Sequence, residues 1–202
     1  MSSPLELVGK AISSVFDQKI VPENQFSIDL VFPGRGTFPP MELEVDWEPS
    51  RDFVHLAIGA LFDLCPLDNR EKVARLLEES AQPFLEGILD PVVPDRFGIY
   101  INEKGAYVPC FDAYVNYGSL EDGEIELVCE RVLARGFRMM MMLSPVFSCI
   151  EKGYLPDRGE RMSLLLKEHG SWEVQSRSTD VPGNGARLPT RLYGGSGLLM
   201  AQ

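Results

Sequence analysis

Residues 41–48 read MELEVDWE, and their strict alternation of apolar and acidic side chains decides the fold. The apolar members are Met41, Leu43, Val45 and Trp47, and the acidic members are Glu42, Glu44, Asp46 and Glu48. Successive side chains of a strand point to opposite faces, so this pattern predicts an antiparallel sheet with one buried face and one wet face. The four acids lie in a row without a convergent loop. We therefore interpret them as a solvated sheet face and not as a metal site.

Other strands are predicted on both sides of this segment. Runs of apolar and β-branched residues bounded by Pro, Gly and Asn predict strands at residues 26–32, 51–65, 97–101 and 107–117. The last two form a hairpin that turns through residues 102–105. Pro109 predicts an edge position or a bulge near the start of its strand.

Three helices are predicted from apolar residues that recur every three or four positions, at residues 3–18, 68–84 and 120–150. The first helix begins with a capping box in which Ser3 precedes Pro4 and Glu6. Pro83 predicts a bend near the end of the second helix. The order is α-β-β-β-α-β-β-α, which predicts an α+β protein with helices packed on one face of an antiparallel sheet.

The long helix at 120–150 carries two apolar groups. One stripe steps by three and four residues through positions 125, 129, 132, 136, 139, 143, 146 and 150, and we predict that it packs in the core together with Met140. Pro145 predicts a break or kink in this helix. A second stripe, on the opposite side, consists of Leu127, Ala134, Phe137 and Met141.

The second stripe is the candidate interaction surface of the sequence. An exposed helix face does not ordinarily collect four apolar residues unless it packs on something. We predict that Phe137 and Met141 point outward and that the second stripe contacts a dimer mate, a partner or the chain's own tail. The alternative is that residues 151–169 cover the second stripe within the monomer.

The chain divides into three parts. Residues 1–150 form the α+β domain, and residues 151–170 add a short helix around 157–168 that Gly170 stops. Residues 171–202 are rich in glycine and show little periodicity, so we predict a flexible or partner-ordered tail.

Composition limits the classes of partner. The formal net charge is −11 and the isoelectric point is near 4.7, which disfavours nucleic acid and anionic membrane surfaces and suits a basic or amphipathic polypeptide. No apolar run approaches the roughly 20 residues of a membrane span, and the first residues do not resemble a secretory signal. The four cysteines, far apart and without a CxxC pair, predict reduced thiols. We expect a cytoplasmic protein without membrane insertion.

The sequence shows no motif for catalysis. Nucleophilic catalysis needs a histidine near Ser or Cys, and the two histidines, His55 and His169, are placed on a polar strand face and at a helix C-terminus. The glycine-rich segments lack the spacing of phosphate-binding loops. We therefore predict a protein that is not an enzyme and that binds no cofactor or metal.

The order of elements resembles the type III secretion chaperone fold, and especially its YbjN-like branch. The resembling segments are ELEVDWEPSRDFVHLAI, NREKVARLLEESAQ, FGIYINEKGAYVPCFDAYVNYG and ELVCERVLARGF, within residues 3–150. The resemblance implies a homodimer that binds another polypeptide as a chaperone, adaptor or regulator, through apolar helix surface and sheet edges. The alternative function is a small structural or assembly subunit that docks into a larger complex through its C-terminal tail.

Overall fold

The computed structural model describes residues 3–16, 20, 27–33, 40–48, 50–61, 70–85, 95–101, 107–118 and 120–177. Its centre is a five-stranded sheet with the strand order β1-β2-β3-β5-β4. Every neighbouring pair is antiparallel. The strands are β1 (Ser27–Phe32), β2 (Met41–Glu48), β3 (Phe53–Ala60), β4 (Asp95–Ile101) and β5 (Tyr107–Asn116). The predicted strands are confirmed, although β3 is shorter than expected and residues 62–65 lie outside the described part.

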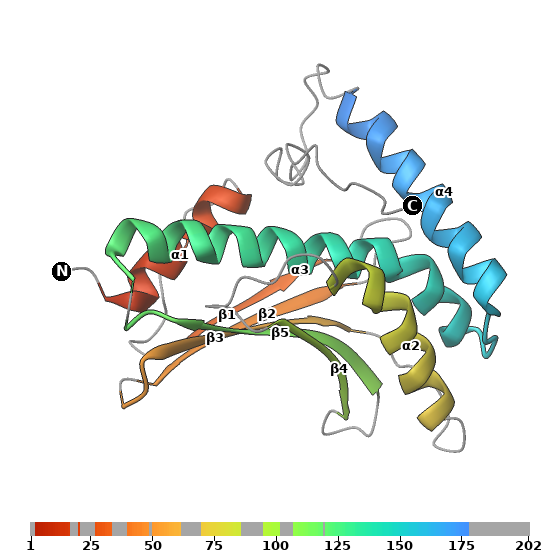
Figure 1. The fold of residues 1–202 in the computed structure, drawn as a ribbon, viewed down its shortest axis with the longest axis horizontal. Helices are drawn as coiled ribbons and strands as arrows, with labels where there is room; N and C mark the ends of the chain where they lie inside the picture. The colour runs from red at the N-terminus through yellow and green to blue at the C-terminus, as the bar shows by residue number, and fades with distance from the viewer. Residues whose placement is uncertain are drawn as a thin grey trace.

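The helices cover one face of this sheet. They are α1 (Pro4–Phe16), α2 (Arg70–Leu85), α3 (Asp122–Glu151) and α4 (Arg158–Arg177). Figure 1 shows α3 running across the sheet, with α1 beside it on the same side, α2 near β4, and α4 pointing away from the body. The α+β class with helices on one face is confirmed, and α4 follows as an additional helix.

Capping boxes stabilise the first turns of α1 and α3, and the box of α1 is the one that the sequence predicts. In the capping box of α1, the backbone N–H of Ser3 donates to the Glu6 carboxylate over 3.0 Å, and the N–H of Glu6 donates to the Ser3 hydroxyl oxygen over 3.2 Å. Glu121 and Glu124 form the corresponding box of α3. These contacts satisfy backbone donors that have no partner within the helix.

Pro145 and Gly170 do not end the helices in which they lie, although the sequence predicts a break or kink at Pro145 and a helix end at Gly170. Pro145 lies inside α3, which continues as one helix to Glu151. Likewise, α4 passes through Gly170 and ends at Arg177, so the prediction that Gly170 stops this helix is wrong. A glycine inside a helix costs about 1 kcal/mol relative to alanine, which makes it unfavourable but not a stop signal. Residues 178–202, most of the predicted tail, lie outside the described residues.

Pro109 lies in a part of β5 that pairs with a neighbouring strand on one side only. β5 is an interior strand, paired with β3 on one side and β4 on the other. Pro109 pairs with Ile99 of β4, whereas the register with β3 ends one residue later, at Cys110. A strand edge that is unpaired on one side tolerates proline.

The core lies between the sheet and the helices, and α3 is its central element. All positions of the predicted core stripe of α3 are buried, from Ile125 to Ile150. All four methionines from Met139 to Met142 are buried as well. The physical reason is that α3 contacts α1, α2, α4, β3 and β5, so protein surrounds its middle on several sides.

Candidate functional site

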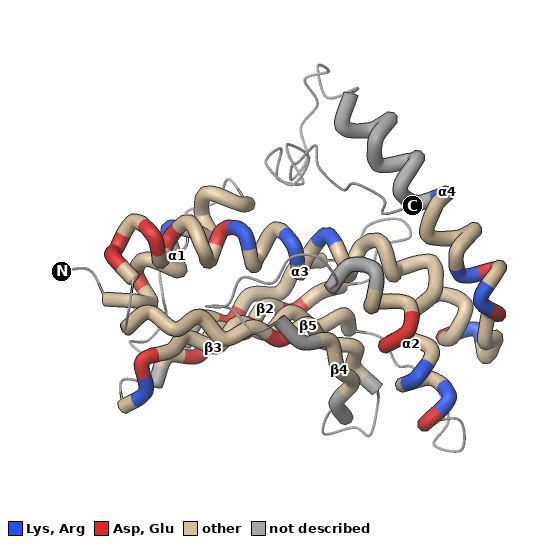
Figure 2. Tube along the Cα trace, in the orientation of Figure 1, with Lys and Arg blue, Asp and Glu red and all other residues tan. Residues whose placement is uncertain are grey.

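The face of the sheet opposite the helices is the candidate site, and we call it the open face. In the described part of the chain, no helix contacts the sheet on this side. Its described side chains are Ser27, Asp29 and Val31 of β1; Glu42, Glu44 and Asp46 of β2; Phe53, His55 and Ala57 of β3; and Val108, Cys110, Asp112, Tyr114 and Asn116 of β5. Figure 2 shows acidic residues along the sheet, whereas basic residues lie mainly on the helices and at the turn between β2 and β3. The predicted wet face is confirmed for β2, where Glu44 and Asp46 are exposed, whereas Ala57, Val108 and Cys110 on the same face are buried.

Strand register brings the carboxylates of the open face together. Asp29 of β1 lies directly opposite Glu44 of β2, and Asp46 of β2 lies opposite His55 of β3. Burial is the largest cause that raises the pKa of Glu44, and the charges of Asp46 and Asp29 raise this pKa further. Like charges directly opposite on neighbouring strands are destabilising, so the Asp29–Glu44 pair does not stabilise the sheet.

His55 is the centre of the open face and contacts both neighbouring strands. Its Nε2 lies 3.0 Å from Oδ1 of Asp112 on β5, and its Nδ1 lies 3.8 Å from Oδ2 of Asp46 on β2. The imidazole also stacks on the ring of Tyr114, with centroids 4.6 Å apart and an interplanar angle of 17°. The hydrogen bond with Asp112 is the largest cause that raises the pKa of His55; burial opposes it, and the nearby carboxylates add to it.

The cysteine beside this group is not arranged as a nucleophile. Sγ of Cys110 lies 3.7 Å from Oδ1 of Asp112, the same oxygen that contacts His55. Burial, followed by the charge of Asp112, raises the pKa of Cys110 far above its ordinary value. A thiol that stays protonated, with a carboxylate instead of an imidazole at its side, lacks the base that nucleophilic catalysis requires.

Aromatic side chains form one end of the open face. The rings of Phe53 and Tyr114 meet edge to face with centroids 5.5 Å apart, and the guanidinium carbon of Arg51 lies 5.7 Å from the Phe53 centroid. On the opposite, inner face, Nε1 of Trp47 donates to the hydroxyl of Tyr117 over 2.9 Å, and both side chains pack against the core. The open face therefore combines a charged centre with an adjoining aromatic surface.

The second stripe of α3 is not the outward surface that the sequence predicts. Phe137 and Met141 are 2% and 1% exposed, Ala134 is partly buried against the core, and Leu127 alone is exposed, at 46%. The prediction that Phe137 and Met141 point outward is therefore wrong.

The reason is that α1 and β1 cover this side of α3. The Phe137 ring packs on Phe16 of α1, with centroids 4.6 Å apart, and on Phe32 of β1, with centroids 5.0 Å apart. These ring contacts come from the start of the chain, and α4, which overlaps the segment 151–169 that the alternative proposed, also contacts α3. α1 itself is buried on more than one side, since its buried residues include Leu7 and Ala11 as well as Val8 and Ile12.

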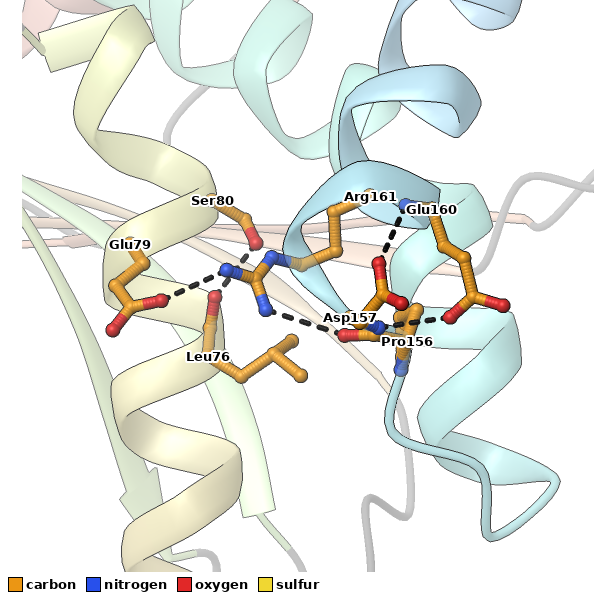
Figure 3. A network of polar contacts seen from close by, with 7 residues as sticks. All are labelled: Leu76, Glu79, Ser80, Pro156, Asp157, Glu160 and Arg161. Carbon is orange, nitrogen blue, oxygen red and sulfur yellow. Dashed lines mark hydrogen bonds and ion pairs between the residues drawn. The ribbon is translucent and has the colours of Figure 1, made fainter.

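A second concave surface lies between α2 and α4, and Figure 3 shows the contacts beside it. Nη2 of Arg161 lies 2.8 Å from Oε2 of Glu79, and Nη1 of Arg161 donates to the carbonyl of Pro156 over 3.2 Å. The adjoining groove of about 510 Å³ is lined by Glu79, Ser80, Gln82, Arg158, Arg161, Met162 and Leu165. The hydroxyl of Ser80 donates to the carbonyl of Leu76 within α2. Of these contacts, only the ion pair between Arg161 and Glu79 joins α4 to α2, and the others are made within one segment of the chain.

The described residues contain no group of three or more His, Cys, Asp or Glu side chains that could hold a metal ion. Among the helices of this part of the chain, none has the length and apolar character needed to cross a membrane. Comparison with protein-family models, with curated proteins and with solved structures yields no significant match.

Part of this site was predicted from the sequence, namely the position of His55 and of the acids of β2 on the polar face. Asp112 and Tyr114 were not predicted to belong to the site. The alternation of these two residues with buried Phe111, Ala113 and Val115 was the available signal for their orientation. Their contact with His55 needed the β3–β5 pairing, which joins residues about 60 positions apart in the chain.

Proposed function

We propose that this protein is a non-enzymatic protein-binding module whose open face binds a positively charged, extended segment of another polypeptide. One observation carries the proposal. In the described part of the chain, no helix covers the open face, and the carboxylates on this face outnumber its one described imidazole, that of His55. Such a module would serve as a chaperone, adaptor or regulator, in agreement with the YbjN-like resemblance of the sequence. We extend the proposal to a cytoplasmic location.

Electrostatic complementarity supports this class of partner. Asp29, Glu44 and Asp46 form a contiguous acidic area in register, and the net charge of the chain is −11. An acidic surface raises the rate of encounter with a basic partner and disfavours acidic ones. Phe53 and Tyr114 add apolar contact area at the end of this charged region.

The edge of the sheet offers a way to hold an extended segment. In the described residues, β1 pairs with β2, and no strand lies on its other side. A free strand edge presents backbone N–H and C=O groups that an added strand can pair with, and Val31 is exposed on this strand. The homodimer implied by the resemblance is not expected to form through the open face, because its like charges would face each other.

A binding titration tests the proposal. The probe is an acetylated 12-residue peptide of alternating Arg and Val with a fluorescent label, followed by anisotropy at low salt. We expect binding that weakens as salt increases, because the contacts are ionic. The variant Glu42→Lys/Glu44→Lys should bind at least about tenfold more weakly, since it reverses two charges on β2.

The matched control carries the same change of charge on another surface. Glu71 and Glu78 are exposed on α2, so Glu71→Lys/Glu78→Lys leaves the open face intact. This control should retain most of the affinity. An equal loss in both variants would show that net charge alone attracts the peptide, and no binding by the wild type would refute the proposal.

The assembly-subunit alternative is favoured by one observation. Met162 and Leu166, one turn apart on α4, are both exposed on the helix that leads to the C-terminal tail. Apolar residues in this arrangement would suit docking into a larger complex. Light scattering after size exclusion discriminates the two functions, because a module should give a stable free species, whereas an orphan subunit should associate less after Met162→Ser/Leu166→Ser.

A further inference from the structure

We propose that protonation of His55 controls the charge that the open face presents to a partner. Protonated His55 pairs with both Asp46 and Asp112, whereas neutral His55 leaves more of their negative charge available to a basic partner. The involvement of a basic partner rests on the proposed function. The pairing of His55 with Asp46 and Asp112 does not rest on it, because this pairing is a property of the isolated protein.

The geometry of His55 distinguishes its two protonation states. Both ring nitrogens face carboxylates, Nε2 toward Asp112 at 3.0 Å and Nδ1 toward Asp46 at 3.8 Å. A neutral imidazole has one N–H group, so it serves one of these carboxylates and turns a lone pair toward the other. The imidazolium has two N–H groups and attracts both carboxylates. Protonation therefore joins the three central strands β2, β3 and β5 through one side chain.

The charged groups around His55 come from every neighbouring strand. β2 contributes Glu44 and Asp46, and β5 contributes Asp112 with Cys110 and Tyr114 beside it. From β1, Asp29 acts on Glu44. Arg96 of β4 is the register partner of Asp112, although its side chain lies outside the described part. Among the described side chains of the open face, His55 is the one that gains a positive charge.

The environment moves this transition toward neutral pH. The hydrogen bond with Asp112 is the largest cause that raises the pKa of His55 from 6.5, and the charges of Asp112, Asp46 and Glu44 add to it. The pKa of Glu44 is also raised, from 4.5. Because the pKa of His55 is raised, the charge at the centre of the open face changes above pH 6.5.

The direction of regulation follows from the sign of the charge. When His55 is protonated, its positive charge cancels part of the acidic potential and occupies the carboxylates that a basic segment would use. When His55 is neutral, the full acidic potential is available. A basic partner should therefore bind more tightly as the pH rises through the pKa of His55, and binding should in turn lower that pKa.

The first experiment measures the pairing without any partner. Histidine resonances of the full chain are followed by NMR as a function of pH, and His55→Gln assigns them, since the chain has two histidines. We expect a midpoint above 6.5 for His55 and a decrease of about one unit in Asp112→Asn, because the variant loses an ion pair. A midpoint at or below 6.5, or one that Asp112→Asn leaves unchanged, would overturn the pairing.

The second experiment measures regulation with the Arg–Val probe peptide between pH 6 and pH 8.5. We expect the affinity of the wild type to rise about three- to tenfold, which corresponds to a pKa change of about half a unit to one unit on binding. His55→Gln should show no such rise, whereas the control His169→Gln should keep it.

The outcomes separate the two proposals. A peptide that binds equally well at every pH would overturn the regulation by His55 and leave the proposed function intact. A peptide that binds at no pH would refute the proposed function and the regulation by His55, while the NMR midpoint would still decide the pairing. A pH dependence that persists in His55→Gln would assign it to another group and overturn the role of His55.

Discussion

The two faces of the sheet differ more than any other two regions of this protein, although they are built from alternate residues of the same strands. On the inner face, Leu43, Leu56 and Ile58 are fully buried under the helices. On the open face, Glu44 and His55 lie one residue away from these side chains along β2 and β3. The inner face stabilises the fold by removing apolar area from water. The open face carries carboxylates that lie opposite each other in Asp29 and Glu44, and this arrangement does not stabilise the sheet.

We expect the largest loss of stability when a buried aromatic side chain of α3 is truncated. Phe137→Ala removes a ring that packs between Phe16 and Phe32, and we expect the free energy of unfolding to fall by about 3 to 5 kcal/mol. Urea denaturation followed by circular dichroism measures this change. Leu127→Ala, at the exposed end of the second stripe, is the control and should change stability by about 0.5 kcal/mol or less. Comparable small losses in both variants would mean that the second stripe is not part of the core.

A single added methyl group tests how tightly α3 lies on the inner face. A Cβ on Gly136 would lie 2.4 Å from Cδ1 of Phe111 and 2.6 Å from Cδ1 of Ile58. Overpacking costs about 1 to 3 kcal/mol, and the better helix propensity of alanine returns up to about 1 kcal/mol. We therefore expect Gly136→Ala to lower the thermal midpoint.

Gly123 provides the matched control on the same helix, because nothing lies within 4 Å of a Cβ added there. Gly123→Ala should leave the thermal midpoint unchanged or raise it, since the change improves helix propensity without crowding. A midpoint that Gly136→Ala also raises would show that the space between α3 and the sheet is looser than the structure indicates.

The pH dependence of stability provides a smaller effect on the open face. The pKa of His55 is raised in the folded state, so its contribution is fully present below the unfolded value of about 6.5. That contribution is lost as the pH rises through the folded pKa. We expect the difference in unfolding free energy between the wild type and His55→Gln to shrink by about 1 kcal/mol across this interval, as measured in urea. A difference that grows with pH would contradict the pairing.

The smallest effect is expected for Glu44→Gln. Because the pKa of Glu44 is raised, the folded state disfavours its ionised form, and the neutral amide should stabilise the protein at pH 7 by a small amount, since solvent screens this exposed side chain. High salt should reduce this gain by screening the carboxylates. Glu78→Gln, on the exposed surface of α2, should give no gain, and a loss of stability in Glu44→Gln would show that its charge is favourable in the folded state.

The predictions from sequence succeeded where short-range periodicity carries the information. The alternation of β2 correctly separated Leu43 and Val45 from Glu44 and Asp46, and the three-and-four spacing of α3 identified Cys129, Met139 and Leu143 as buried. The Ser3–Glu6 capping box is equally local. In each case, the residues that decide the outcome lie within a few positions of one another.

The predictions failed where a distant element decides the environment. Helix periodicity correctly grouped Phe137 with Met141, but it could not show that α1 would cover that side. Gly170 looked like a helix end, yet α4 continues beyond it. The homodimer and the identity of the partner remain proposals.

The sequence by itself determined which side chains share a face, because the periods of a strand and a helix follow from backbone geometry alone. It therefore specified an acidic sheet face with His55 on it and an apolar stripe along α3. The tertiary structure alone decided what each face meets. It buried Phe137 beneath α1, left the open face uncovered by any helix of the described residues, and placed Asp112 at 3.0 Å from His55. Contacts of this kind join residues far apart in the chain, and they exist only after the strands are ordered and the helices are packed.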